Sequence, residues 1–206
     1  FSIPIGFSDA EATPSLCAGA VGYRALRLTG LRDGAQMGLT GLGASGHLVL
    51  KMVKHLYPNS KVFVFARSNG QRAFARDLGA VWAGDTGDES PEKLNCIIDT
   101  TPVWGPILEA LRNLAPGGRL VINAIRKEEV DKESLLRLDY PVHLWMEKEI
   151  KSVANVSPRD LREVLALAAE MDIKPEIQTF PLEKANQALV ELKSRKIHGA
   201  KVLRID

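Results

Sequence analysis

The stretch that decides the fold runs from Ala35 to Gly46 and reads Ala-Gln-Met-Gly-Leu-Thr-Gly-Leu-Gly-Ala-Ser-Gly. Its first half is a short, mostly apolar run that predicts a strand. Its second half has the pattern Gly41-x-Gly43-x-x-Gly46, and apolar residues then recur at helical spacing as far as Pro58. A glycine-rich turn between a strand and a helix is typical of proteins that bind a dinucleotide.

Each glycine of this loop has a separate physical role. The first permits a tight turn, the second lets the backbone approach a pyrophosphate, and the third allows close packing of helix on strand. The start of the helix adds free N–H groups and partial positive charge. We therefore assign the whole loop to cofactor binding; the alternative is a purely structural tight turn. The assigned residues are Gly41, Leu42, Gly43, Ala44, Ser45 and Gly46.

Strand and helix patterns alternate along the rest of the chain. Lys61 to Phe65, Cys96 to Ile98 and Leu120 to Ile125 are apolar runs without alternation, which is typical of parallel strands buried on both faces. Ile107 to Leu114 has helical spacing, and Ser157-Pro158-Arg159-Asp160 is a helix start with a hydroxyl cap. The pattern predicts an α/β fold with a doubly wound parallel sheet, the Rossmann arrangement.

The end of the second predicted strand indicates which dinucleotide is bound. An acid that holds the adenosine ribose is expected about 20 residues after the glycine loop, but Ala66, Arg67 and Ser68 stand there, with Arg72 one turn on. An Arg and a hydroxyl suit a 2′-phosphate through charge-assisted hydrogen bonds. We expect NADP(H), with NAD possible and a solvated Arg as the alternative interpretation.

Further candidates follow other strands. We assign Thr100, Asn123 and Ala124 to the cofactor site as well, and we expect Asp99 to line the crevice at the carboxyl edge of the sheet. His47 follows the glycine loop and is expected either near the phosphates or on the helix surface.

Composition excludes several classes of protein. The chain has 206 residues, 45% of them hydrophobic, and Lys+Arg 27 against Asp+Glu 25 gives a formal charge of +2. So small an excess argues against nucleic acid or a membrane surface as the partner. Two cysteines cannot form a disulfide framework. No apolar run reaches the roughly 18 residues of a membrane span, and no signal segment appears, so we expect a cytoplasmic protein.

The segment Thr13-Pro-Ser-Leu-Cys17-Ala-Gly-Ala-Val-Gly-Tyr-Arg-Ala-Leu26 resembles zinc-dependent alcohol dehydrogenases of the medium-chain dehydrogenase/reductase superfamily. The glycine loop, Leu114 to Arg119 and Ile197 to Leu203 agree with it, and His143 to Asn155 is similar to a propanol-preferring bacterial branch. The resemblance covers essentially the whole chain. It implies that residues 1–20 end a GroES-like catalytic domain, that 21–176 form the dinucleotide-binding domain, and that 177–206 return to the catalytic domain.

The resemblance also implies a chemistry. Cys17 aligns with the last protein ligand of the catalytic zinc, which polarises the substrate oxygen while hydride passes between alcohol or aldehyde and NADP(H). The other zinc ligands belong, in the family, to an N-terminal domain that is not present here. We therefore expect this chain to bind cofactor, to lack zinc and to be inactive alone. Assembly into a homodimer or homotetramer is expected by analogy.

Three alternatives stay open at this point. One is a zinc-free quinone or enone reductase of the same superfamily, and another is a non-catalytic nucleotide-sensing module. The third is a methyltransferase, although Ala66 stands where such an enzyme would carry an acid.

Overall fold

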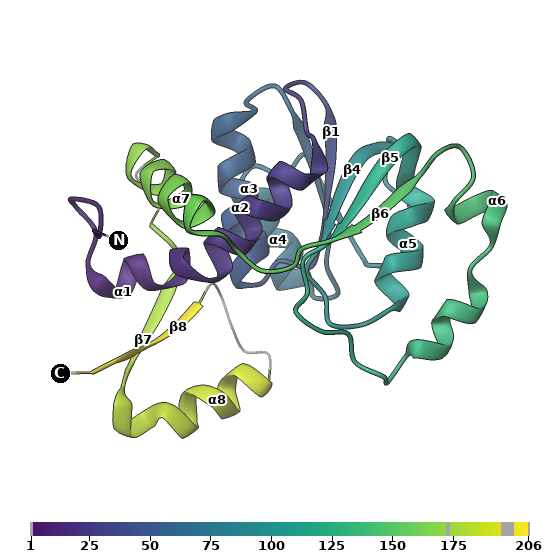
Figure 1. Ribbon diagram of the computed structural model, residues 1–206. Coiled ribbons are helices and arrows are strands. Elements are labelled where there is room, and N and C mark those ends of the chain that lie inside the picture. The colour runs from purple at the N-terminus through teal and green to yellow at the C-terminus, as the bar shows by residue number, and fades with distance from the viewer. Residues whose placement is uncertain (1, 172–173, 195–199, 206) are drawn as a thin grey trace.

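A six-stranded parallel sheet forms the centre of the molecule (Figure 1). The computed structural model describes residues 2–171, 174–194 and 200–205. The strands stand in the order β3-β2-β1-β4-β5-β6, which is the order of a dinucleotide-binding fold and confirms the predicted class. Their bounds are β1 Gln36–Thr40, β2 Lys61–Phe65, β3 Trp82–Gly84, β4 Leu94–Asp99, β5 Leu114–Ile122 and β6 Glu149–Ser152.

Helices cover both faces of this sheet. One face carries α2 (Ala18–Thr29), α3 (Ala44–Leu56), α4 (Asn69–Asp77) and α7 (Pro158–Glu170), and the other carries α5 (Gly105–Asn113). Val62 and Val64 pack with the first group, whereas Phe63 and Phe65 pack with α5. Successive side chains of a strand point to opposite faces, so an unbroken apolar run is what a sheet covered on both sides requires.

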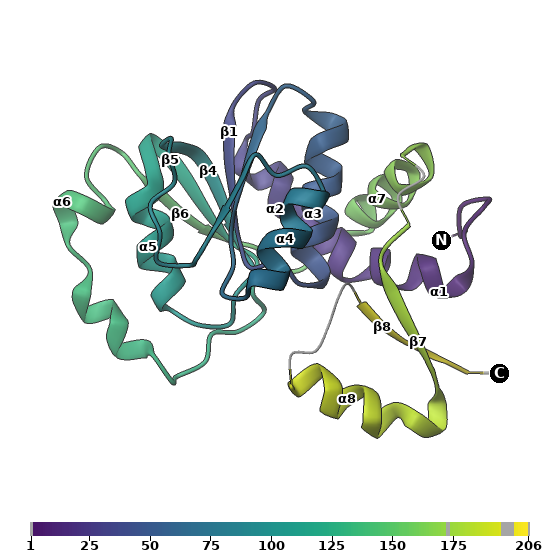
Figure 2. The ribbon, with the colours of Figure 1, turned by 180° about the vertical axis from the view of Figure 1, so that it is seen from behind.

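A smaller parallel sheet lies apart from the first. It pairs β7 (Ile177–Pro181) with β8 (Ala200–Arg204), and α8 (Ala185–Lys193) lies beside it (Figure 2). Short helical turns complete the chain: α1 Asp9–Ala12, η1 Thr13–Leu16, η2 Lys132–Arg137, α6 Tyr140–His143 and η3 Leu182–Lys184. The division into domains at residues 20 and 176 stays a prediction.

Element boundaries depart from the sequence prediction in two places. The helix of α5 ends at Asn113, and Leu114 already belongs to β5, which ends at Ile122 and not at residue 125. The chain leaves the sheet there, although the backbone N–H of Asn123 still donates to the carbonyl of Asp99 at 2.8 Å. The helix start at Ser157 is confirmed, because its side chain and that of Asp160 form a reciprocal capping box.

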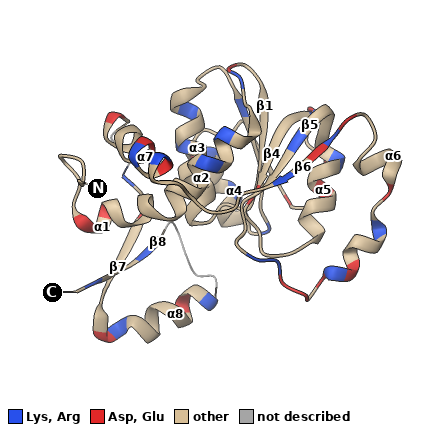
Figure 3. Ribbon diagram, viewed as in Figure 1, with Lys and Arg blue, Asp and Glu red and all other residues tan. Residues whose placement is uncertain are grey.

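Charged residues are interspersed over the elements (Figure 3). A buried exception joins α2 to α7, where Asp160, 1% exposed, pairs with Arg24 at 2.9 Å and with Arg27 at 3.3 Å. Among the described residues, no helix is long and apolar enough to cross a membrane.

Candidate nucleotide-binding site

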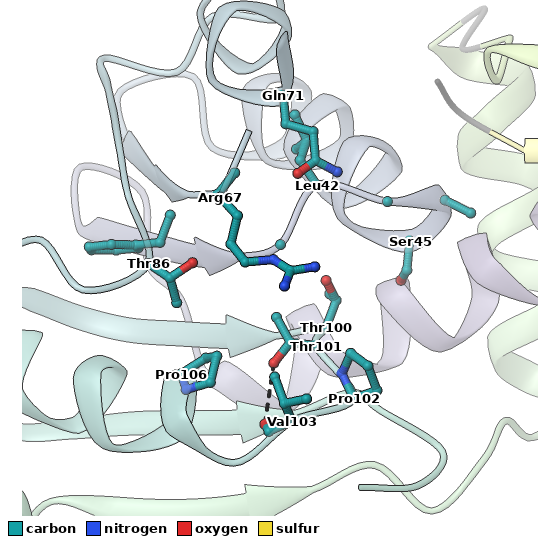
Figure 4. A pocket seen from close by; sticks show the side chains of 15 residues that line it. Leu42, Ser45, Arg67, Gln71, Thr86, Thr100, Thr101, Pro102, Val103 and Pro106 are labelled. Atoms are coloured by element: carbon teal, nitrogen blue, oxygen red, sulfur yellow. Dashed lines mark hydrogen bonds between the residues drawn. The ribbon is translucent and has the colours of Figure 1, made fainter. Parts of the chain in front are cut away.

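A pocket of about 280 Å³ opens at the carboxyl edge of the large sheet, where β1, β2 and β4 end (Figure 4). In an open α/β sheet the ligand binds outside the carboxyl ends of the strands, where the strand order reverses. Here that point lies between β1 and β4. The pocket is lined by the glycine loop, the end of β2 and the segment after β4: Gly41, Leu42, Gly43, Ala44, Ser45, Phe65, Ala66, Arg67, Gln71, Thr86, Thr100, Thr101, Pro102, Val103 and Pro106.

The glycine loop has the geometry that its sequence predicts. Gly41 has φ +83, and a Cβ on Gly46 would lie 2.6 Å from the carbonyl oxygen of Gly41, so neither position tolerates a side chain. Gly43 has no heavy atom within 4 Å of a Cβ position, which leaves its pocket side open to a ligand. Gly43 also caps α3, and in the described chain no side chain satisfies the first N–H groups of that helix. Such an end binds anions.

The end of β2 supplies a cation. Figure 4 shows the Arg67 side chain reaching across the pocket toward Thr100 and Thr101. Among the described residues, no Asp or Glu lines the pocket. Ser68 does not line it either, because its hydroxyl caps α4 by accepting from the Gln71 N–H at 3.2 Å.

Arg72 is not available for the role the sequence suggested. Its guanidinium donates to the carbonyl oxygens of Ala66 at 2.7 Å and Arg67 at 3.1 Å, contacts Asn69, and pairs with Asp85 at 2.9 Å. The Arg72 side chain therefore shapes the backbone on which Arg67 is mounted. Sequence spacing placed it one turn after the strand but could not show that it folds back.

Of the candidates after β4 and β5, only Thr100 lines the pocket. Its hydroxyl donates to the Thr40 carbonyl at 2.9 Å, which ties the end of β4 to that of β1. Asn123 is buried behind the loop, where its Nδ2 donates to Ser45 Oγ at 2.8 Å. Ala124 is half-buried and outside the pocket lining.

Asp99 does not line the crevice, which corrects the expectation. It is 0% exposed, and its Oδ2 pairs with Lys127 Nζ at 2.5 Å. Burial raises the pKa of Asp99, while Lys127 and Thr101 oppose that rise. Lys127 also donates to the carbonyls of Thr101 at 2.7 Å and Val103 at 3.0 Å. The pair fixes the loop that forms one pocket wall, and nothing in the sequence singled out Lys127.

His47 is buried behind the glycine loop, outside the pocket lining, and is not on the helix surface. It is 0% exposed, and its Nδ1 lies 3.0 Å from the carbonyl oxygen of Gly43. Burial lowers the pKa of His47, so the ring is neutral at pH 7 and supports the middle glycine from behind.

Cys17 stands exposed at the start of α2. In the described parts of the chain, no group of three or more His, Cys, Asp or Glu could hold a metal ion. One thiolate falls short of the three protein ligands of a catalytic zinc site. The described residues therefore do not provide such a site.

Comparison with known proteins decides the family. Residues 77–203 match the family model of the zinc-binding dehydrogenases. The chain belongs to that family. It is 36% identical, over 98% of its length, to a probable alcohol dehydrogenase, AdhA, of Mycobacterium tuberculosis, and spans 57% of that relative. Membership in a dehydrogenase family argues against the methyltransferase alternative.

Solved structures agree on the fold of this chain. Acetophenone reductase from Geotrichum candidum, in complex with NAD, superposes with a TM-score of 0.82 at 21% identity, over 98% of this chain and 58% of its own. A structure described as CAD from Helicobacter pylori, complexed with NADP(H), gives 0.79 at 21% identity, over 98% and 56%. At such identity the likeness establishes the fold alone.

Proposed function

We propose that this chain is the NADP(H)-binding part of an alcohol dehydrogenase. The observation that carries the proposal is the pocket itself, where a glycine loop and an uncapped helix start face the Arg67 side chain and no carboxylate is present. The relatives support it, since the similar proteins include an alcohol dehydrogenase and structures complexed with NAD and with NADP(H).

The glycine loop, Arg67 and Thr100 each have a separate role in nucleotide binding. Gly41, Gly43 and Gly46 give the pyrophosphate access to backbone N–H groups, and the Arg67 guanidinium binds the 2′-phosphate through charge-assisted hydrogen bonds. The bound nicotinamide supplies a carbon that gives or takes hydride. Thr100 holds the ends of β4 and β1 together where the pocket opens.

We propose a catalytic zinc for the whole protein and not for this chain by itself. The described residues contain no group of three or more His, Cys, Asp or Glu that could hold a metal ion, so no step of the reaction is assigned to a metal held by this chain. We expect this chain by itself to bind NADPH without oxidising alcohols. For the whole protein we propose an alcohol or aldehyde as substrate, a cytoplasmic location, and assembly into homodimers or homotetramers.

Parallel titration with NADPH and NADH, followed by nucleotide fluorescence, tests the proposal. Arg67→Ala should weaken NADPH binding roughly 10- to 100-fold, the size of a hydrogen bond to a charged group, and leave NADH within about threefold. Arg162→Ala removes an exposed Arg from α7 and should change neither. If NADH binds the parent chain as tightly as NADPH, the 2′-phosphate assignment is wrong; if neither binds, the nucleotide site is wrong.

A further inference from the structure

The Ser45 hydroxyl, in the glycine loop, both donates and accepts a hydrogen bond. Ser45 Oγ donates to the carbonyl oxygen of Ala18 at 3.0 Å and accepts from Asn123 Nδ2 at 2.8 Å. Ser45 also lines the pocket (Figure 4). A single side chain thus joins the pocket, the first residue of α2 and the residue that follows β5.

The contact between α2 and α3 leaves this hydroxyl little freedom. A Cβ on Gly22 would lie 2.8 Å from Ser45 Oγ and 2.7 Å from Val49 Cγ2, so the helices approach as closely as glycine permits. A displacement of Ser45 toward α2 must therefore displace α2 as well.

Asn123 sets the direction of the hydrogen bonds. Its side chain is buried, and Nδ2 occupies a lone pair of the Ser45 oxygen. A hydroxyl has one proton to give, and the Ser45 proton is thereby left for the Ala18 carbonyl. Asn123 Oδ1 is buried with no hydrogen-bond partner among the described residues, so the amide is held on the Ser45 side alone.

We propose that Ser45 and Asn123 are positioning residues that couple the nucleotide pocket to the turn carrying Cys17. A nucleotide that holds the glycine loop also holds Ser45, hence the Ala18 carbonyl, and opposes opening of the chain at Cys17, which directly precedes Ala18. The inference rests on the proposed function, because the ligand is the nucleotide assigned above.

Cys17 reports on the coupling because its thiol is exposed. Its alkylation by iodoacetamide at constant pH can be followed by mass spectrometry. Cys96 serves as the internal control, since it is 2% exposed and burial raises its pKa to about 12. Without nucleotide, Ser45→Ala and Asn123→Ala should each speed Cys17 alkylation two- to tenfold, the size expected for one lost hydrogen bond.

The matched control is Ser60→Ala, which removes another serine hydroxyl, a buried one outside the pocket lining. Ser60 Oγ donates to the carbonyl oxygen of Arg32 at 3.3 Å, so its variant should keep the parent rate at Cys17. If Ser45→Ala and Asn123→Ala also keep the parent rate, the bridge does not hold Cys17 and the inference is wrong.

Saturating NADPH should slow alkylation of the parent at least threefold and have little effect on Ser45→Ala, at concentrations where fluorescence shows both to be bound. Equal slowing in the two would mean that the nucleotide covers the thiol directly, which overturns the coupling. Failure of the parent to bind NADPH would instead refute the proposed function, while the nucleotide-free rates would still decide whether the bridge exists.

Discussion

Removing Lys127 tests how the pocket wall is held. Lys127 is 8% exposed and its partner Asp99 is 0% exposed, with 2.5 Å between Nζ and Oδ2. Lys127→Met keeps an unbranched side chain of similar length and removes the charge. It leaves the Asp99 carboxylate buried with Thr101 as its remaining donor, and it leaves two loop carbonyls without Lys127.

Lys127→Met is expected to lower the unfolding free energy by a large amount for a single substitution. Breaking a buried ion pair by removing one partner costs roughly 3–5 kcal/mol of unfolding free energy, because the other charge stays buried without compensation. Lys127→Met/Asp99→Asn should recover a large part of this, since no charge then remains to be buried. Lys132→Met is the control: Lys132 pairs with Glu129 at 2.9 Å, but the two side chains are 58% and 77% exposed. Its cost should stay under about 1 kcal/mol.

The stability lost in Lys127→Met should depend on pH in a definite direction. The pKa of Asp99 is raised in the folded protein, and loss of Lys127 raises it further. A carboxyl with a raised folded pKa stabilises fully below its unfolded pKa, about 3.9, and that stability is lost as pH rises through the folded value. The deficit of Lys127→Met relative to the parent should therefore be smallest in acid and grow toward neutral pH.

Urea unfolding followed by tryptophan fluorescence measures these differences, with Trp104 adjoining the affected loop. NADPH binding should weaken in the same variant, because Thr101 and Val103 line the pocket. A cost equal to that of Lys132→Met, or a deficit independent of pH between about pH 4 and 7, would refute the reasoning.

Two further predictions concern packing and charge on the α2 face. Gly22→Ala should lower the unfolding free energy by roughly 1–3 kcal/mol, because its Cβ would meet Val49 and Ser45. The control Gly70→Ala, which has open space around it in α4, should be neutral or stabilising by up to about 1 kcal/mol. Urea denaturation of the two variants and the parent measures both differences. Although burial alone would raise the pKa of Asp160, hydrogen bonds from Ser157 and an Arg outweigh it and lower the pKa. The stability that Asp160 contributes is therefore present above about pH 4 and lost as pH falls, so Asp160→Asn should be destabilised at neutral pH and approach the parent in acid, as acid titration of unfolding would show.

The elements that the sequence predicted best are those whose neighbours in the chain decide them. The glycine loop is fixed by backbone sterics within six residues, and the Ser157 helix start by a cap three residues long, so both follow from local reading. The strands β3 and β6 escaped prediction. The first has three residues, and the second, Glu-Ile-Lys-Ser, is exposed along its whole length and shows no apolar run.

The same distinction between local and distant neighbours applies to the candidate site residues. That Arg67 lines the pocket could be predicted because a strand end at a fixed distance from the loop has a known position in this fold; its contact with the nucleotide stays a prediction. Arg72 was assigned by spacing alone, and the structure instead turns its Nη1 and Nη2 toward four backbone and side-chain acceptors around it. A charged residue near a site is available to a ligand only if its own neighbourhood leaves it unpaired, and spacing does not report that.

Lys127 is the opposite case to Arg72, because the sequence did not single it out and the structure places it behind the pocket wall. Its residue type and its place in a charged stretch, Arg126 to Glu129, predict an exposed side chain, yet it is buried because it meets Asp99 and two carbonyls 24 to 28 residues away. Asn123 likewise reaches Ser45 across 78 residues. Both side chains follow β5, and both end on the backbone or side chains that shape the pocket. The segment after β5 therefore positions two parts of the pocket wall, the loop after β4 and Ser45, without lining the pocket itself. This role becomes visible only once the sheet has brought the strand ends together.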